Sequence, residues 1–164
     1  METASFYVAP FVDFRSADGQ FRKFRIVFVD REPFPVHLAI HDDWAIWYYN
    51  ARMEMDAGKR SEEAAFMADM ETALGSRAMT ALRAIGRRID LDYVGLDCAV
   101  LSDGRLLVFE VETAMIVHDH DPAELFPYKK QFIPRILDAV VALFDRRIQA
   151  SPLPEGRSVR PSRA

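Results

Sequence analysis

The chain has 164 residues, 50% of them apolar and 28% charged, with a formal net charge of −4. This length suits one compact domain, and the apolar fraction excludes a chain that stays disordered for lack of a core. The weakly acidic balance disfavours a protein that wraps nucleic acid, because such a protein carries a basic field. The sequence shows neither a membrane-length apolar run nor the pattern of a secretory signal. Its one cysteine, Cys98, allows no internal disulfide. We therefore expect a cytoplasmic protein.

The first third of the chain predicts β-strands. Aromatic and β-branched residues fill 6–14, alternation of polar and apolar residues marks 21–29, and further candidates lie at 34–40 and 44–49. Pro33 and Pro35 limit ladder donors at the start of the third candidate and indicate that this strand begins at a sheet edge or a bulge.

The middle and end of the chain predict helices around a second pair of strands. Ser61 is the expected N-cap of a first helix that ends at Gly75, and Ser76 is expected to cap the next. Strands follow at 93–101 and 105–111, and a last helix at 132–148 has Pro134 in its first turn. This order predicts an α+β fold with a mostly antiparallel sheet over residues 1–150. The Pro-rich and then basic stretch 151–164 predicts a disordered tail.

The two strands of that second pair form a hairpin that carries several acids. Asp103-Gly104 lies between two apolar runs, which is a strong signal for a two-residue turn. Such a turn would place Asp97 opposite Glu110, with Glu112 on the same face of the sheet. Like charges directly opposite each other destabilise a strand pair. We therefore expect basic side chains, a protonated acid or a divalent cation such as Mg²⁺ to offset the repulsion.

This hairpin resembles the final strands of the ATP-grasp superfamily, in which an acid on one strand and an acid-x-Asn on the next hold Mg²⁺ against the phosphates of ATP. Asp97 matches the first acid and Glu110 the second, while Glu112 stands where most members carry Asn. The string VFEVETAMIVH at 108–118 carries the resemblance most clearly. It implies that these three acids are metal ligands and that ATP and Mg²⁺ are the cofactors.

The resemblance extends upstream. YVAPFVD at 7–13 resembles the family's linker strand, whose backbone faces adenine, and Asp13 lies near the position of a ribose-binding acid. The strand at 22–29 resembles the one that carries the phosphate-binding basic residue. Arg25 is its best match and the implied catalytic group, with Lys23 on the same face as a possible second cation. The resemblance also implies that Phe109 packs near adenine. Strict strand alternation turns that side chain to the opposite face, and a β-bulge would reconcile the two.

The resemblance covers 7–148 and corresponds to the family's C-terminal subdomain alone. Family members hold ATP between two subdomains, of which the earlier one supplies a lysine pair and a glycine-rich flap. We therefore expect this chain to be a fragment of a longer protein, or to receive the other subdomain from a partner. The complete enzyme would be a carboxylate–amine ligase that works through an acyl phosphate. The isolated chain would bind nucleotide weakly or not at all and would catalyse nothing.

Two other functions stay open. A metal-dependent phosphodiesterase or nuclease would have an acid on one strand and acid-x-Lys on the next, but Glu112 occupies the lysine position. A non-catalytic interaction or regulatory module could keep the same fold. The sequence indicates neither the substrates nor the oligomeric state, and it gives no sign of a nucleic-acid or membrane partner.

Two further features are weaker candidates. His118-Asp119-His120-Asp121 places two histidines two residues apart in a loop, which is not the spacing of a standard zinc site. A role near the substrate or the phosphates fits this motif equally well. Cys98 alternates with Asp97 and is expected to pack on the core face as a small apolar residue.

Overall fold

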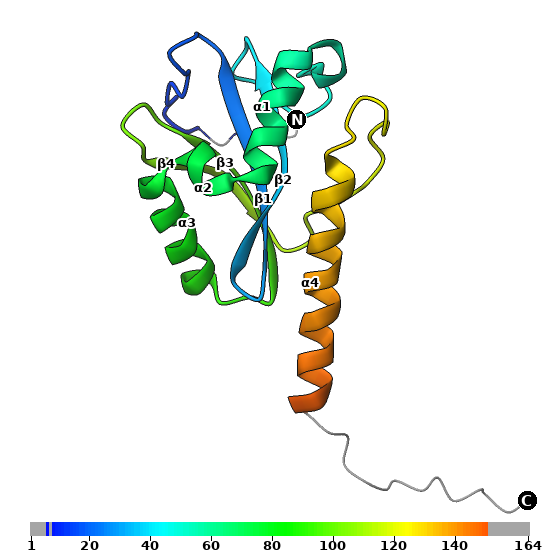
Figure 1. The fold of residues 1–164 in the computed structure, drawn as a ribbon. Coiled ribbons are helices and arrows are strands. Elements are labelled where there is room, and N and C mark those ends of the chain that lie inside the picture. Colours follow the sequence, from blue (N-terminus) through cyan, green and yellow to red (C-terminus); the bar gives the residue numbers. More distant parts are fainter. Residues whose placement is uncertain (1–5, 7, 151–164) are drawn as a thin grey trace, which may run out of the picture.

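The chain folds as an antiparallel sheet with helices packed against it (Figure 1). The computed structural model describes residue 6 and residues 8–150, so the tail predicted at 151–164 lies outside the described residues. Within this part the fold is α+β, as predicted. Its elements are β1 (Phe21–Val29), β2 (Glu32–His41), the short 3₁₀ helix η1 (Met53–Met55), α1 (Ala57–Ala68), α2 (Met70–Leu74), α3 (Ser76–Ile89), β3 (Tyr93–Val100), β4 (Leu106–Glu112) and α4 (Lys129–Ala150). None of these helices combines the length and the apolar character that crossing a bilayer requires.

The strands of the described part lie in the order β2-β1-β3-β4, and every neighbouring pair is antiparallel. The strand with the two prolines, β2, is at one edge, which confirms the prediction for Pro33 and Pro35. The hairpin of β3 and β4, which carries Asp97, Glu110 and Glu112, forms the other side of the sheet, with β3 paired to β1. This arrangement puts the basic residues of β1 directly beside the acids of β3.

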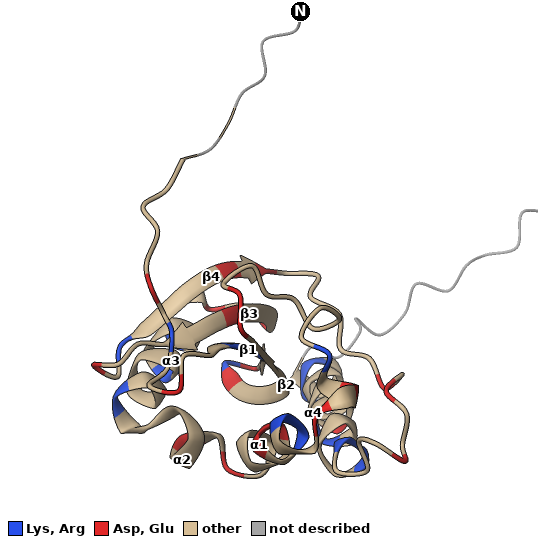
Figure 2. Cartoon of the chain, turned by 90° about the horizontal axis from the view of Figure 1, so that it is seen from above, with Lys and Arg blue, Asp and Glu red and all other residues tan. Residues whose placement is uncertain are grey.

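The two faces of the sheet differ in chemistry. Seen end-on in Figure 2, the strands arch over α1 and α2. Phe24 faces these helices, and its ring centroid lies 5.0 Å from that of Phe66 in α1. Successive side chains of a strand point to opposite faces, so Lys23 and Arg25 face away from the helices. Cys98, paired with Phe24, is fully buried on the helix side as predicted, and burial together with the charge of Asp97 raises the pKa of its thiol to about 12.

Two of the predicted strands are wrong. Residues 8–14 form no strand, and the backbone pairs with the sheet just after them, at an isolated bridge between Arg15 and Phe21. Both sides of the neighbouring β1 are already paired, with β2 and β3, so the aromatic segment has no free side of β1 to join. Residues 44–49 instead form bends and turns that follow β2. Their backbone is held by Asn50, whose side chain accepts from Trp47 N at 2.9 Å and donates to Ala45 O at 2.8 Å.

The helices form near where periodicity predicts them, but the first predicted helix is divided at Asp69 into α1 and α2, and several helix ends differ. Asp56 rather than Ser61 caps α1, accepting from the backbone nitrogens of the first turn at 2.7 and 3.1 Å. Gly75 separates α2 from α3, as expected, with a positive φ of 80°. Gly75, rather than the predicted Ser76, is also the N-cap residue of α3. The last helix begins at Lys129, so Pro134 lies beyond the first turn that the prediction gave it.

Candidate functional site

The register of the hairpin depends on two irregularities that cancel. The turn is longer than the predicted two residues: Leu101 N donates to Arg105 O at 2.9 Å, and Val100 rather than Leu101 pairs with Leu106. This shifts the expected register by one residue. A β-bulge then shifts it back, because Cys98 pairs with Val108 while Asp97 pairs with Glu110, which leaves Phe109 as the extra residue. Asp97 and Glu110 are therefore opposite each other, as predicted, although the turn is not.

Asp97 is buried and fully engaged with the basic residues of β1. Its side chain is 1% exposed, and Arg25 donates from Nε to Oδ1 at 2.8 Å and from Nη2 to Oδ2 at 2.9 Å. Lys23 Nζ donates to the same Oδ2 at 2.9 Å. Burial by itself would raise the pKa of Asp97, but these hydrogen bonds outweigh it and lower the pKa below its usual value. Basic side chains thus supply the offset that the facing carboxylates require.

The other two predicted ligands are more loosely held. Glu110 is half-exposed, and its Oε1 lies 4.0 Å from Arg25 Nη2. Glu112 is exposed and pairs with Gly95, and it is close enough to Arg25 for its charge to raise the pKa of that guanidinium together with Asp97 and Glu110. Among the described residues, no three His, Cys, Asp or Glu side chains form a group that could hold a metal ion. The structure therefore brings Asp97 and Glu110 together, without a preformed three-carboxylate cluster.

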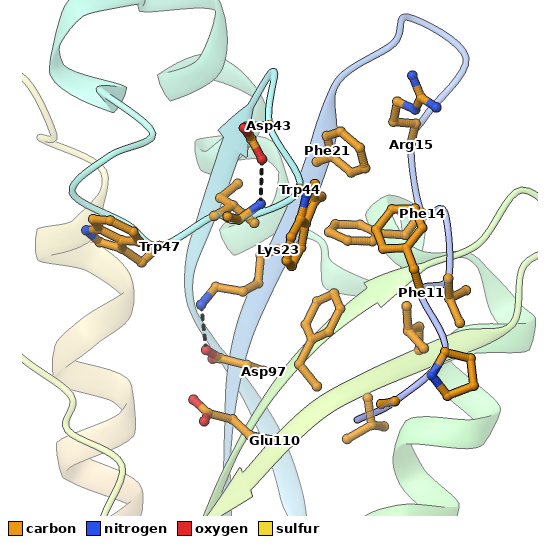
Figure 3. Close-up of a pocket in the computed structure, with 18 of the residues that line it drawn as sticks. Phe11, Phe14, Arg15, Phe21, Lys23, Asp43, Trp44, Trp47, Asp97 and Glu110 are labelled. Atoms are coloured by element: carbon orange, nitrogen blue, oxygen red, sulfur yellow. Dashed lines mark hydrogen bonds and ion pairs between the residues drawn. The ribbon is translucent and has the colours of Figure 1, made fainter. Parts of the chain in front are cut away.

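An open pocket of about 1170 Å³ lies over this face of the sheet (Figure 3). Its walls come from the segment before β1, from the loop after β2, and from β1, β3 and β4. Lys23, Asp97 and Glu110 form its charged end. The rest is largely aromatic and apolar and includes Phe11, Phe14, Phe21, Trp44, Trp47 and Phe109. The pocket therefore joins an apolar surface to a cluster of cations and carboxylates.

The bulge places Phe109 in this aromatic part. Its ring centroid lies 4.9 Å from that of Phe14, which in turn lies 4.7 Å from Phe21, both in edge-to-face geometry. Trp44, in the loop after β2, is 59% exposed, and its ring centroid lies 5.7 Å from that of Phe11. The conflict between strand alternation and the expected position of Phe109 is thus resolved by the bulge.

Asp13 lies apart from the pocket wall, although its neighbours Val12 and Phe14 belong to it. Its carboxylate binds Arg15 at 2.7 Å, and both side chains are exposed. Hydrogen bonds from the Arg15 side chain and backbone lower the pKa of Asp13. The residue therefore holds the turn of the segment before β1 and makes no contact with the charged end.

Among the residues that the structure describes, the His118–Asp121 motif belongs to no group of three potential ligands that could hold a metal ion. The rings of His118 and His120 stack with centroids 5.5 Å apart, and Nδ1 of His118 is buried without a hydrogen-bond partner in the described structure. Asp121, the last residue of the motif, instead binds Lys129 Nζ at 2.6 Å.

Sequence reasoning missed a buried ionic cluster around Lys129. Its ammonium contacts Tyr48 Oη at 2.6 Å, Asp121 at 2.6 Å and Glu63 at 3.1 Å. Glu63 is fully buried, and it also accepts from Tyr128 Oη at 2.5 Å. Burial raises the pKa of Glu63, and its charge together with burial raises the pKa of both tyrosines.

A signal for this cluster was present in the sequence. Lys129 lies at helical spacing from Ile133 and Ile136, which are buried in α4, and Glu63 lies at helical spacing from Phe66 and Met67, which are buried in α1. Periodicity alone therefore places a lysine and a glutamate on core faces, and charges are rarely buried unless they are paired.

Comparisons with protein-family models, with curated proteins and with solved structures found no match for this chain. The functional conclusion therefore depends on the site itself.

Proposed function

We propose that the pocket binds ATP together with Mg²⁺, and that the chain is the corresponding half of an ATP-grasp carboxylate–amine ligase. The observation that carries this proposal is the composition of the pocket, in which an aromatic surface ends at Lys23, Asp97 and Glu110. A nucleotide has the same polarity, with a flat base at one end and phosphates with their metal at the other. Ligand sites are typically apolar concavities with a few convergent polar groups.

The aromatic end would receive the base. Phe14 and Phe109 form a continuous aromatic surface there, and aromatic rings pack well against flat ring systems. Asp13 could serve the ribose, as the resemblance implies, only after it releases Arg15.

The charged end would receive the phosphates and the metal. Lys23 offers the phosphates a flexible point charge from the pocket wall. Arg25, whose planar fork holds Asp97 and which does not itself line the pocket, would add its positive charge beside them. Asp97 and Glu110 offer the hard oxygen ligands that Mg²⁺ prefers, with phosphate oxygens and water completing its shell, and Glu112 is the third candidate ligand. When bound, the metal would neutralise charge on the phosphates.

In the complete enzyme, a substrate carboxylate would attack the terminal phosphorus of ATP and release ADP. An amine would then attack the resulting acyl phosphate and release phosphate. Arg25 would stabilise the charge on the transferring phosphoryl group. The second subdomain would come from sequence upstream or from a partner. The proposed location is the cytoplasm, since the lone thiol of Cys98 fits a reducing compartment.

Calorimetry with ATP and Mg²⁺ tests this proposal on the chain and on a version extended upstream. We expect binding that is weak for the chain and stronger for the extended protein. Asp97→Asn and Glu110→Gln should each reduce the affinity by at least tenfold. Asp145→Asn, a change at an exposed acid of α4, should leave it unchanged.

The other outcomes would identify the alternatives. Metal-dependent cleavage of DNA by the extended protein would favour the nuclease. An absence of nucleotide binding in both forms would overturn the proposal and favour a non-catalytic module.

A further inference from the structure

The oxygens of Asp97 already have partners within the protein. Oδ1 accepts from Arg25, and Oδ2 accepts from both Arg25 and Lys23, all within 2.9 Å. The residues that the proposed function assigns to the metal and to the phosphates are thus bound to each other. Each ion that binds these groups competes with the existing pairs, and full transfer of a group to the ion separates a pair.

The cost of separation differs from that of a surface ion pair. Asp97 is 1% exposed, and the side chains of Lys23 and Arg25 are only 15% and 24% exposed. Removing one partner from a buried pair is strongly unfavourable, because it leaves a buried charge without compensation. A phosphate that binds Lys23 and Arg25 would leave the buried charge of Asp97 unpaired. A cation that binds Asp97 would leave the charges of Lys23 and Arg25 unpaired.

The charges favour joint entry as well. Asp97, Glu110 and the nearby Glu112 carry one negative charge more than Lys23 and Arg25 do. A phosphate alone would add charge of the same sign, whereas a phosphate that enters with a divalent cation adds little net charge.

We propose that a divalent cation and a phosphate group enter this site by exchange of partners: the cation takes Asp97 as the phosphate takes Lys23, so that each ion raises the affinity for the other. This inference rests on the proposed nucleotide site. Such coupling is reciprocal by thermodynamic linkage and typically amounts to a factor of about 5–150.

Lys23 is the group that changes partner. It holds Asp97 through one bond at the end of a flexible stem, whereas Arg25 holds the carboxylate through two bonds from a planar fork. Arg25 can therefore keep Asp97 oriented while Lys23 turns to the phosphate.

This exchange predicts that two substitutions which weaken joint binding each raise the affinity for one component of the ligand, either Mg²⁺ or ADP. Lys23→Met removes a competitor for Asp97, so Mg²⁺ alone should bind roughly tenfold more tightly than to the wild type. Asp97→Asn frees the cations, so ADP in the presence of EDTA should bind more tightly than to the wild type. Both variants should bind Mg²⁺ and ADP together more weakly than the wild type does.

NMR titrations of the whole chain can measure these affinities even in the millimolar range. Each protein is titrated with Mg²⁺ alone, with ADP in EDTA and with both, and the last is corrected for the Mg–ADP complex formed in buffer. Lys130→Met and Asp145→Asn, at exposed positions of α4, are matched controls and should behave as the wild type. Melting curves identify any variant that does not fold, and the Lys23→Met titration decides the question without Asp97→Asn.

The results separate this inference from the proposed function. Joint binding of Mg²⁺ and ADP to the wild type, with Mg²⁺ affinity unchanged or weakened in Lys23→Met, would overturn the exchange and leave the nucleotide site in place. Failure of every ligand combination to bind the wild-type chain and the upstream-extended protein would overturn both.

Discussion

At the scale of single residues, several ionisable groups on the sheet face that carries the site are buried. One of them is His37, which lies opposite Arg25 in the β1–β2 pair and has its ring centroid 4.4 Å from that of Tyr48. Burial lowers the pKa of His37 well below 6.5, and the positive charges of Arg25 and Lys129 lower it further. The imidazole is therefore neutral in the folded protein.

This histidine predicts a loss of stability in mild acid. Below about pH 6.5 the unfolded chain protonates His37 while the folded protein does not, so the free energy of unfolding falls as the pH falls. The slope approaches about 1.4 kcal/mol per pH unit for one proton. Urea unfolding of the wild type and of His37→Phe between pH 7 and pH 5 measures the difference. The variant should lose this part of the slope, whereas His120→Phe, changed at an exposed histidine, should keep it; an unchanged slope in His37→Phe would refute the assignment.

At the scale of elements, helix α3 lies unusually close to the β1–β2 hairpin. A Cβ added at Gly86 would lie 2.7 Å from Arg31 O and 2.8 Å from the ring of Phe28. The glycine is thus explained by close packing and not by helix propensity, which favours alanine by about 1 kcal/mol.

Gly86→Ala should therefore destabilise the protein, against its helix propensity. Overpacking typically costs about 1–3 kcal/mol, and we expect a net loss of roughly 1–2 kcal/mol. Denaturant unfolding measures it, and Ala84→Gly at an exposed position of the same helix calibrates the propensity. A Gly86→Ala protein as stable as the wild type would show that α3 can move away from the hairpin.

At the scale of the whole molecule, the ionic cluster around Lys129 joins parts of the chain that are distant in sequence. Glu63 belongs to α1, Tyr48 to the loop after β2, Asp121 to the segment that leads into α4, and Lys129 to the first turn of α4. The cluster therefore fixes α4 and the loop beside the pocket against α1. It contributes to the position of the pocket wall without lining it.

Lys129→Met should be strongly destabilising, because it leaves Glu63 and Asp121 without their cation. Breaking a buried pair costs about 3–5 kcal/mol. Adding Glu63→Gln should restore part of the loss, since the amide keeps the size of the side chain and removes the buried charge. Thermal melting of the two variants, with Lys130→Met as the exposed control, measures both effects. A double variant no more stable than Lys129→Met would contradict the electrostatic explanation.

Several parts of the fold and site could be predicted from local patterns. Alternation predicted β1, apolar runs around Asp103-Gly104 predicted β3 and β4, and helical periodicity located the helices. The prolines of β2 indicated an edge or a bulge. Other parts could not, because they depend on competition between segments. The aromatic segment before β1 has strand-like residues, yet both sides of the neighbouring β1 are already paired. Helix α1 begins at Ala57 because the side chain of Asp56 caps it, so Ser61 lies inside the helix.

The sequence by itself determined a hairpin of two apolar strands that carries Asp97 on one strand and Glu110 on the other. A longer turn and a bulge at Phe109, whose register shifts cancel, then bring these two acids opposite each other. Only the tertiary structure decided what neutralises them. Lys23 and Arg25 reach Asp97 because β3 pairs with β1 across more than 70 residues of intervening sequence. Pairing between strands so far apart depends on how helices and loops pack around the sheet, and local patterns carry no record of that packing.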